Sequence, residues 1–507
     1  MAKILIVGGG VAGLSAGIYA QLSGHQAVIY EKHNVAGGNL TGWQRGECHI
    51  DNCIHWLTGT NPNTNAYKIW RELGVLGDIE IMQGESLYTC EHKGTRISLS
   101  KDLEKIKNDM LKISPKDKAE IIKFIKAIEV LQYMCDIGGK NHDKKCGVSF
   151  YFRHMPMLIK YHRMSTGELS KRFKNPVLQQ FISCFLGKDF ASLGLLFVFA
   201  HFTGENGGIP KGSSYAMAQR MANRFISLGG ELYTGVEVVK INKIGNIATS
   251  ALLSSGDEVN FDYTVLTGDP KMTFNKILDM DMPKQLVKAY NDKRLIRFSS
   301  YQCAFVCDKD KLDFTGDLIF KIPLEYQRKL HTTHLILREF THEESFAPHG
   351  KTVLQSLTFC SETDCLNFIN LRKNSPAYNA LKKEIAKMVF ELILSRFPAL
   401  KDSLKCIDVW TPATYKRFIN SDIGSFMSFA MPPKYIPARA SNKIKGLSNA
   451  FLATQWQQVP GGLPIAALCG KDANKAICAL EAHKSRHKVR KPVKVALRES
   501  NPFVSER

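Results

Sequence analysis

Three glycines near the N-terminus have the spacing of a phosphate-binding turn. Gly8, Gly10 and Gly13 directly follow the apolar run at residues 3–7. In a strand–turn–helix unit the first glycine makes the tight turn, the second lets backbone N–H groups approach a pyrophosphate, and the third lets the helix pack close to the strands. The helix N-terminus holds the phosphates with its free N–H groups and its positive dipole end.

A carboxylate stands where such a unit binds a ribose. Glu31 ends a second apolar run, residues 27–30, and lies eighteen residues beyond Gly13. There it can accept hydrogen bonds from both ribose hydroxyls and would repel a 2′-phosphate. The competing interpretation is a secretory signal with residues 4–20 as its apolar core, but the glycines and the lack of a cleavage signal disfavour it. The sequence therefore predicts a dinucleotide site.

Two further glycine clusters fit the remainder of a long cofactor. Residues 37–39 follow the ribose acid closely, and a glycine pair there lets the backbone pass near the ligand. Residues 461–463 form a glycine turn that opens a helix near the C-terminus. The N–H groups and positive dipole end of such a helix suit the electron-rich edge of a reduced flavin.

The composition describes an ordinary globular protein of two or three domains. Of the 507 residues, 44% are hydrophobic and 23% are charged. The thirteen cysteines are scattered and form no C-x-x-C pair, which predicts a reducing, cytoplasmic location. The loosely spaced pairs at 303/307 and 360/365 are interpreted as strand or loop cysteines, so no metal site is expected.

The net charge of +21 indicates attraction to anionic surfaces. Its densest block, residues 484–498, lacks the aromatic interleaving of a base-stacking surface, so nucleic acid is not an expected partner. The block is interpreted as a solvated tail or as a peripheral anchor at the inner face of a membrane. No apolar run reaches the eighteen residues of a membrane span, and the nearest, residues 190–202, predicts a buried helix or a cavity wall.

The three glycine clusters, in this order, resemble those of the flavoprotein family of bacterial-type phytoene desaturases, carotenoid isomerases and retinol saturases. The resemblance extends to about residue 480 and includes segments 210–241 and 411–415. It implies FAD as the cofactor. The implied FAD-binding residues are Gly8, Gly10, Gly13, Glu31, Gly37, Gly38, Asn39, Trp56, Val238, Gln455, Gly461, Gly462 and Leu463.

The resemblance implies an α/β fold, in which a Rossmann-like FAD-binding domain of the glutathione-reductase type carries an inserted α+β substrate domain. A helix at 215–228, a glycine turn and a strand within 229–241, and a strand and helix after residue 446 fit this expectation. The expected divisions are FAD-binding segments 1–75, 206–275 and 436–482, a helical apolar substrate region 76–205, a sheet-based substrate domain 276–435 and a basic tail 483–507.

The implied enzyme is an FAD-dependent oxidoreductase that desaturates, saturates or isomerises a long apolar polyene or prenoid lipid, such as a carotenoid or retinoid. His55 is the titratable side chain expected beside the ring, as a hydrogen-bond donor or proton relay, or as a purely structural histidine. Residues 148–202 are expected to line the substrate pocket. A flavin amine oxidase and a non-catalytic lipid-binding flavoprotein are the alternatives, and the electron partner is left open.

Overall fold

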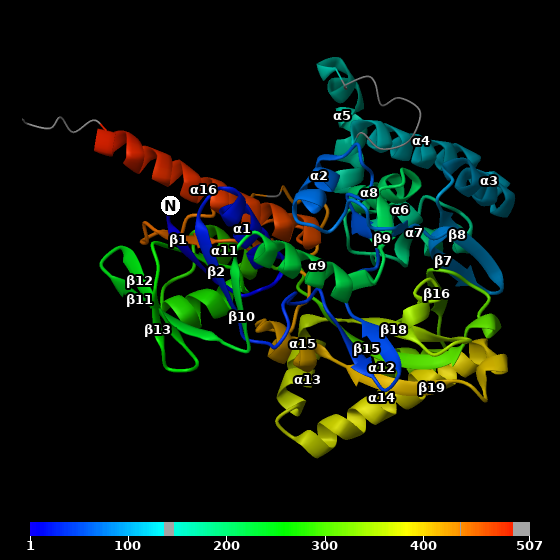
Figure 1. Cartoon of the computed structure of the whole chain (residues 1–507). Coiled ribbons are helices and arrows are strands. Elements are labelled where there is room, and N and C mark those ends of the chain that lie inside the picture. The colour runs from blue at the N-terminus through cyan, green and yellow to red at the C-terminus, as the bar shows by residue number, and fades with distance from the viewer. Residues whose placement is uncertain (136–146, 437, 490–507) are drawn as a thin grey trace, which may run out of the picture.

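The computed structural model describes residues 1–135, 147–436 and 438–489, which are arranged around two large sheets (Figure 1). The first sheet is parallel, and its central strands are buried because helices cover them. In spatial order its strands are β10 (Glu231–Thr234), β2 (Gln26–Glu31), β1 (Lys3–Val7), β14 (Tyr263–Leu266) and β20 (Ala450–Leu452). This sheet confirms the expected Rossmann-like architecture.

Helix α1 (Val11–Leu22) packs against α16 (Leu463–Val489) and α9 (Ser213–Ser227) beside this sheet. Glycines set the close approach. A Cβ added to Gly470 of α16 would lie 2.4 Å from the Ala12 carbonyl oxygen, and one added to Gly17 of α1 would lie 2.7 Å from the Phe225 ring. The first and last parts of the chain therefore pack together beside one sheet.

The prediction of a single strand over residues 229–241 is wrong. Strand β10 pairs in parallel with β2, whereas β11 (Val238–Ile244) pairs antiparallel with β12 (Ile247–Leu253), which also pairs with β13 (Glu258–Asn260). Gly235, with φ of +76°, turns the chain between β10 and β11. Only glycine adopts this left-handed conformation without strain, so the turn ends one strand and begins the next.

The second sheet contains seven strands, and helices α13 (Glu362–Leu371) and α14 (Ser375–Arg396) contribute to its core. Five of its strands lie within 276–435, where the sequence predicts strand-like runs and a helix. In spatial order the strands are β19 (Lys405–Trp410), β15 (Ser299–Asp308), β18 (Lys351–Cys360), β17 (His334–Glu339), β16 (Asp317–Lys321), β7 (Ser86–His92) and β8 (Thr95–Ser100).

The expectation that residues 76–205 are helical is wrong at the start of that region. Strands β7 and β8 lie there, and β7 pairs in parallel with β16 of the second sheet. A short run with apolar residues fits either a strand or a buried helix, and partner strands far along the chain decided this case. The rest is helical: α3 (Leu103–Ile113), α4 (Lys118–Met134), α5 (Val148–Arg163), α6 (Thr166–Ser170), α7 (Pro176–Ser183) and α8 (Ser192–Thr203).

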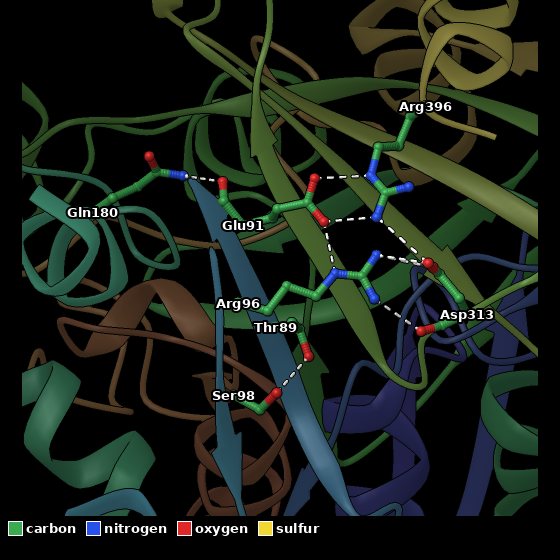
Figure 2. A network of polar contacts seen from close by, with 7 residues as sticks. All are labelled: Thr89, Glu91, Arg96, Ser98, Gln180, Asp313 and Arg396. Atoms are coloured by element: carbon green, nitrogen blue, oxygen red, sulfur yellow. Dashed lines mark hydrogen bonds and ion pairs between the residues drawn. The ribbon is translucent and has the colours of Figure 1, made fainter. Parts of the chain in front are cut away.

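A network of ion pairs joins this helical region to the second sheet (Figure 2). The Glu91 carboxylate accepts from Arg96 of β8 and from Arg396 of α14, with N–O distances of 2.6–2.8 Å. Asp313 contacts both guanidinium groups, and the Glu91 carbonyl accepts a hydrogen bond from the Gln180 amide of α7. Glu91 therefore connects a helix, a hairpin and α14 at one point.

The division of the chain into domains stays a prediction. Shorter elements connect the units described above. They include α2 (Asn65–Glu72), β3 (Gly42–Arg45), β4 (Cys48–Asp51), β5 (Leu57–Thr58), β6 (Ile81–Met82), β9 (Gly207–Pro210), α10 (Pro270–Met272), α11 (Lys284–Asn291), α12 (Leu324–Leu330) and α15 (Pro412–Ile419). Among the described residues, no helix combines the length and apolar character needed to cross a bilayer.

Candidate functional site

A cavity of about 1110 Å³ extends from the glycine turn after β1 to helix α8. Its wall includes Gly8 and Glu31 at one end and Phe197 at the other. The cavity thus brings the predicted nucleotide site and an apolar surface into one continuous space.

The turn after β1 has the geometry that its three glycines predict. Gly8 has φ of +97°, and a Cβ on Gly13 would lie 1.9 Å from the Gly8 carbonyl oxygen. Gly10 precedes α1, and in the described part of the chain no side chain caps that helix. Its positive end therefore faces the cavity without a carboxylate of its own, which fits a bound pyrophosphate.

Glu31 ends β2 and is buried, with 6% of its surface exposed. Its Oε2 atom accepts from the Gly9 amide at 2.8 Å, and its Oε1 atom accepts from the His33 amide at 2.9 Å. These bonds hold the carboxylate beside the phosphate turn. Val238, at the start of β11, lies on the same wall of the cavity.

The two other glycine clusters also line the cavity. Gly37 has φ of +131°, and Gly38 adjoins Gly10, since a Cβ on Gly38 would lie 3.2 Å from the Gly10 Cα atom. The Asn39 side chain accepts from the Asn52 amide at 3.2 Å. This contact places a polar side chain beside the glycine pair.

The C-terminal cluster opens α16. Gly462 has φ of +120°, and its amide donates to the Gln455 Oε1 atom at 3.0 Å. A Cβ on Gly461 would lie 2.3 Å from the Ser428 hydroxyl, so this backbone is closely enclosed. The cavity wall continues through Leu463, the first residue of α16. The second helix N-terminus thus faces the same cavity.

His55 and Trp56 lie between the nucleotide end and the apolar end. The His55 Nδ1 atom lies 3.8 Å from the Asp317 Oδ2 atom. The Arg338 guanidinium donates two hydrogen bonds to the Asp317 carboxylate. The Nε–Oδ1 distance is 2.6 Å and the Nη2–Oδ2 distance is 2.9 Å. Burial lowers the pKa of His55, and the Arg338 charge lowers it further. The imidazole is therefore neutral at neutral pH.

Asp317 and Arg338 were not predicted from the sequence. Both are buried on adjacent strands of the second sheet, where Arg338 also donates to the Ile54 carbonyl oxygen at 3.3 Å. Burial raises the pKa of Asp317, but the neighbouring Arg338 and His55 outweigh this effect and hold it below its usual range. A charged residue within an otherwise apolar strand indicates a buried ion pair. The sequence around Asp317 does not show that Arg338 is its partner.

A second polar group was also missed. The Tyr415 hydroxyl accepts from the Gln302 amide at 2.8 Å and from the Trp410 indole at 3.0 Å, and it donates to the Asn52 amide oxygen at 2.9 Å. Asn52 contacts Asn39 in turn. The second sheet is thereby connected to the cluster at 37–39 by a continuous set of hydrogen bonds.

The opposite end of the cavity is apolar. Phe298 lies at its centre, with ring centroids of Phe190, Phe359 and Phe426 between 5.5 and 6.1 Å away. His201 of α8 also lines the wall, and burial lowers its pKa to about 4. This imidazole is therefore a neutral group within a largely apolar surface.

The prediction that residues 148–202 line the pocket is correct only for part of that range. Residues 185–191 and parts of α8 face the cavity, whereas residues 148–184 do not. Helix α5 instead lies at the surface, and α7 packs into the core beneath β7. Within α8, Leu196 is fully buried and Phe197 faces the cavity, as their 100° separation predicts.

Residues 11–285 match the family described as flavin-containing amine oxidoreductase. The chain belongs to this family. It is 22% identical to the 4,4′-diaponeurosporene oxygenase of Staphylococcus haemolyticus, over 94% of this chain and 97% of that protein. It is 24% identical to prolycopene isomerase 1 of an Oncidium hybrid cultivar, over 83% of this chain and 74% of that protein.

Solved structures share the fold. An oxidoreductase from Methanosarcina mazei has a TM-score of 0.57 at 14% identity, and the match covers 94% of this chain and all of that one. Cyclohexylamine oxidase from Brevibacterium oxydans has a TM-score of 0.57 at 12% identity, with 95% and 99% covered. With the family match, these findings confirm that this flavoprotein is an FAD-dependent oxidoreductase related to carotenoid oxygenases and isomerases.

Proposed function

We propose that this oxidoreductase desaturates, saturates or isomerises a long apolar polyene of the carotenoid or retinoid class. The observation that carries the proposal is the continuous cavity, which joins the glycine clusters to a wall of phenylalanine, leucine and methionine side chains. An apolar ligand gains free energy by leaving water for such a surface. The names of the carotenoid-related relatives agree with this substrate class.

Different residues along the cavity are assigned to different parts of FAD. Gly8 and Gly10 line the cavity and would hold the FAD pyrophosphate, together with Gly13, which packs behind them on the Gly8 carbonyl. Glu31 would hold the adenosine ribose, and Val238 the adenine. The residues assigned to the ribityl chain and ring system are Gly37, Gly38, Asn39, Gln455, Gly461, Gly462 and Leu463, with His55 and Trp56 beside the ring. Bound FAD supplies hydride or electron transfer at a carbon–carbon bond.

His55 is proposed to donate a hydrogen bond toward the ring or to carry a proton. Its lowered pKa keeps the imidazole neutral, so it can both donate and accept. Asp317 lies beside Nδ1 and favours the tautomer that carries its proton on that atom. Nε2 would then be the accepting atom, so in this tautomer the imidazole can take up a proton but donates no hydrogen bond toward the ring. The chain's contribution is mainly the position of this group and the exclusion of water by the apolar wall.

A flavin amine oxidase is the second candidate function, because the family name and one structural neighbour refer to amines. Anaerobic reduction of the bound flavin distinguishes the two. A detergent-solubilised carotene should reduce the oxidised flavin if it is desaturated, reoxidise the reduced flavin if it is saturated, or give an isomerised product. Aliphatic amines should not reduce the flavin. Reduction by amines alone would contradict the polyene proposal. Polyene binding without a change in flavin or product would indicate a lipid-binding flavoprotein.

Adjacent residues of α8 test the position of the substrate. Leu196→Gln places an amide in a fully buried site and should lower the free energy of unfolding by about 2–5 kcal/mol. Phe197→Gln changes the cavity wall, so it should preserve folding and FAD content but reduce carotene retention. Denaturation, released FAD and extracted carotene measure these effects. Equal destabilisation by both changes would mean that Phe197 is a core residue.

The substrate class suggests contact with a membrane surface, and we propose that the basic tail contributes to it. Most of its basic residues, Arg490, Lys491, Lys494 and Arg498 among them, lie outside the described residues. Lys484 lies within them, and its ammonium group contacts the Tyr263 hydroxyl and Glu481. Lys484 is exposed, so it can contribute to the electrostatic role together with the residues beyond it.

A further inference from the structure

Helix α5 exposes an apolar stripe on the surface of the protein. Val148 is 73% exposed, Phe152 76%, Met155 42% and Ile159 46%. These positions are separated by four, three and four residues, so their side chains share one face of the helix. In Figure 1, α5 projects from the helical region beside α4.

The core of the protein does not account for this stripe. The inward face of α5 is already formed by Tyr161, which is 2% exposed, and by Met157 and Leu158, which pack on the core beneath β7. A surface helix normally has one apolar face and a polar face opposite it. Here a second apolar face stands in water, and contiguous exposed apolar surface marks an interaction site.

Basic side chains outnumber acidic ones around the stripe. Within its described range, α5 contains Arg153, Lys160 and Arg163 and no acidic residue. Lys123 and Lys126 of α4 line a groove between the two helices. Each also pairs with an acid of α4, Glu120 and Glu129 respectively, so the cations of α5 itself carry most of the net positive charge. Cations beside exposed aromatic and aliphatic side chains are typical of helices that lie in the interface of an anionic bilayer.

We propose that this face of α5 docks on the surface of an anionic lipid bilayer. Phe152 and Ile159 would enter the boundary between headgroups and acyl chains. Arg153 and Lys160 would contact lipid phosphates beside the helix. A bilayer fits better than a folded partner, because the apolar stripe is narrow and the cations beside it are on long flexible side chains.

The helix connects this surface to the cavity. The Ser192 amide donates to the Met164 carbonyl oxygen just beyond α5, and the Lys434 amide donates to the His162 carbonyl oxygen. Ala191 and Met431, which are hydrogen-bonded to each other, line the cavity. Docking through α5 would bring the apolar end of the cavity near the lipid. The use of this arrangement for substrate entry rests on the proposed function, but the docking itself does not.

Co-sedimentation of the full-length holoprotein with vesicles tests the inference. The vesicles are phosphatidylcholine alone or phosphatidylcholine mixed with phosphatidylglycerol. Phe152→Ser/Ile159→Ser should reduce partitioning to mixed vesicles by roughly tenfold or more, because most of the buried apolar area is lost. Arg153→Gln/Lys160→Gln should reduce partitioning to mixed vesicles at low salt, and the remaining partitioning should depend less on salt concentration. Ile244→Ser/Leu324→Ser removes equally exposed apolar side chains elsewhere and should change nothing.

Several outcomes separate this inference from its alternatives. Unchanged partitioning of the α5 variants would overturn it, and loss only on truncation after Ala482 would assign membrane contact to the basic tail. Dissociation of a dimer by Phe152→Ser/Ile159→Ser would show that a second copy covers the stripe and would also overturn it. All variants should retain FAD and convert detergent-solubilised carotene to product as the wild type does, with the flavin supplied in the oxidised or the reduced form. A failure of that reaction in the wild type would contradict the proposed function and leave the docking result intact.

Discussion

Replacing Glu31 with arginine is expected to weaken FAD binding by about 1–3 kcal/mol. The change removes a carboxylate that is 6% exposed and that accepts from the Gly9 and His33 amides. It also leaves the Gly9 amide without its partner and places a cation where the ribose is expected. The dissociation constant can be measured by titrating apoprotein with FAD and following flavin fluorescence.

Two further variants separate loss of charge from loss of folding. Glu31→Gln keeps an oxygen acceptor and should have a smaller effect than arginine. Glu231→Arg reverses an exposed charge on the neighbouring strand β10, outside the cavity, and should leave FAD affinity unchanged. Equal FAD affinity of Glu31→Arg and the wild type would remove Glu31 from the binding site.

Replacing Arg338 with methionine is expected to lower the free energy of unfolding by about 3–5 kcal/mol, because it leaves the buried Asp317 carboxylate without its ion-pair partner. It should also raise the pKa of His55, since Arg338 helps to lower it and the nearby Asp317 charge would remain. As the pH falls, the His55 imidazole would then become protonated at a higher pH than in the wild type. Denaturation and the pH profile of anaerobic flavin reduction measure the two effects.

The double change Asp317→Leu/Arg338→Met provides the control. It removes both charges from the interior, so it should regain most of the stability lost in Arg338→Met. It should not reproduce the raised pKa of His55, because no carboxylate remains beside the ring. If Arg338→Met alone left both stability and the pH profile unchanged, the buried pair would have no role in holding or tuning His55.

Local sequence was sufficient to predict the backbone geometry at the glycine-rich end of the cavity. The turn at Gly8, the close approach of Gly13 and the terminal position of Glu31 depend on neighbouring residues and on backbone conformations that glycine alone adopts easily. The helix beginning at Leu463 was predicted for the same reason, because a glycine turn precedes it. These features could be predicted since each is completed within one strand–turn–helix unit or one turn.

Other parts of the fold depended on distant partners. Strand β7 was predicted as part of a helical region, because nothing near it specifies the pairing with β16, more than two hundred residues away. The ion pair of Asp317 and Arg338 and the bonds around Tyr415 were missed for the same reason. A residue type shows that a side chain needs a partner when buried, but not which one it finds.

The sequence by itself determined the nucleotide-binding turn, the acid expected at the ribose and the resemblance that implies FAD. Only the tertiary structure decided which apolar residues became cavity wall and which became core. Phe197 and Leu196 are equally apolar neighbours, yet only Phe197 faces the cavity. The tertiary structure also leaves the stripe at Phe152 exposed, because other residues of α5 already make the contacts between this helix and the core. Apolar character drives burial without direction, and the packing of whole elements decides where each side chain points.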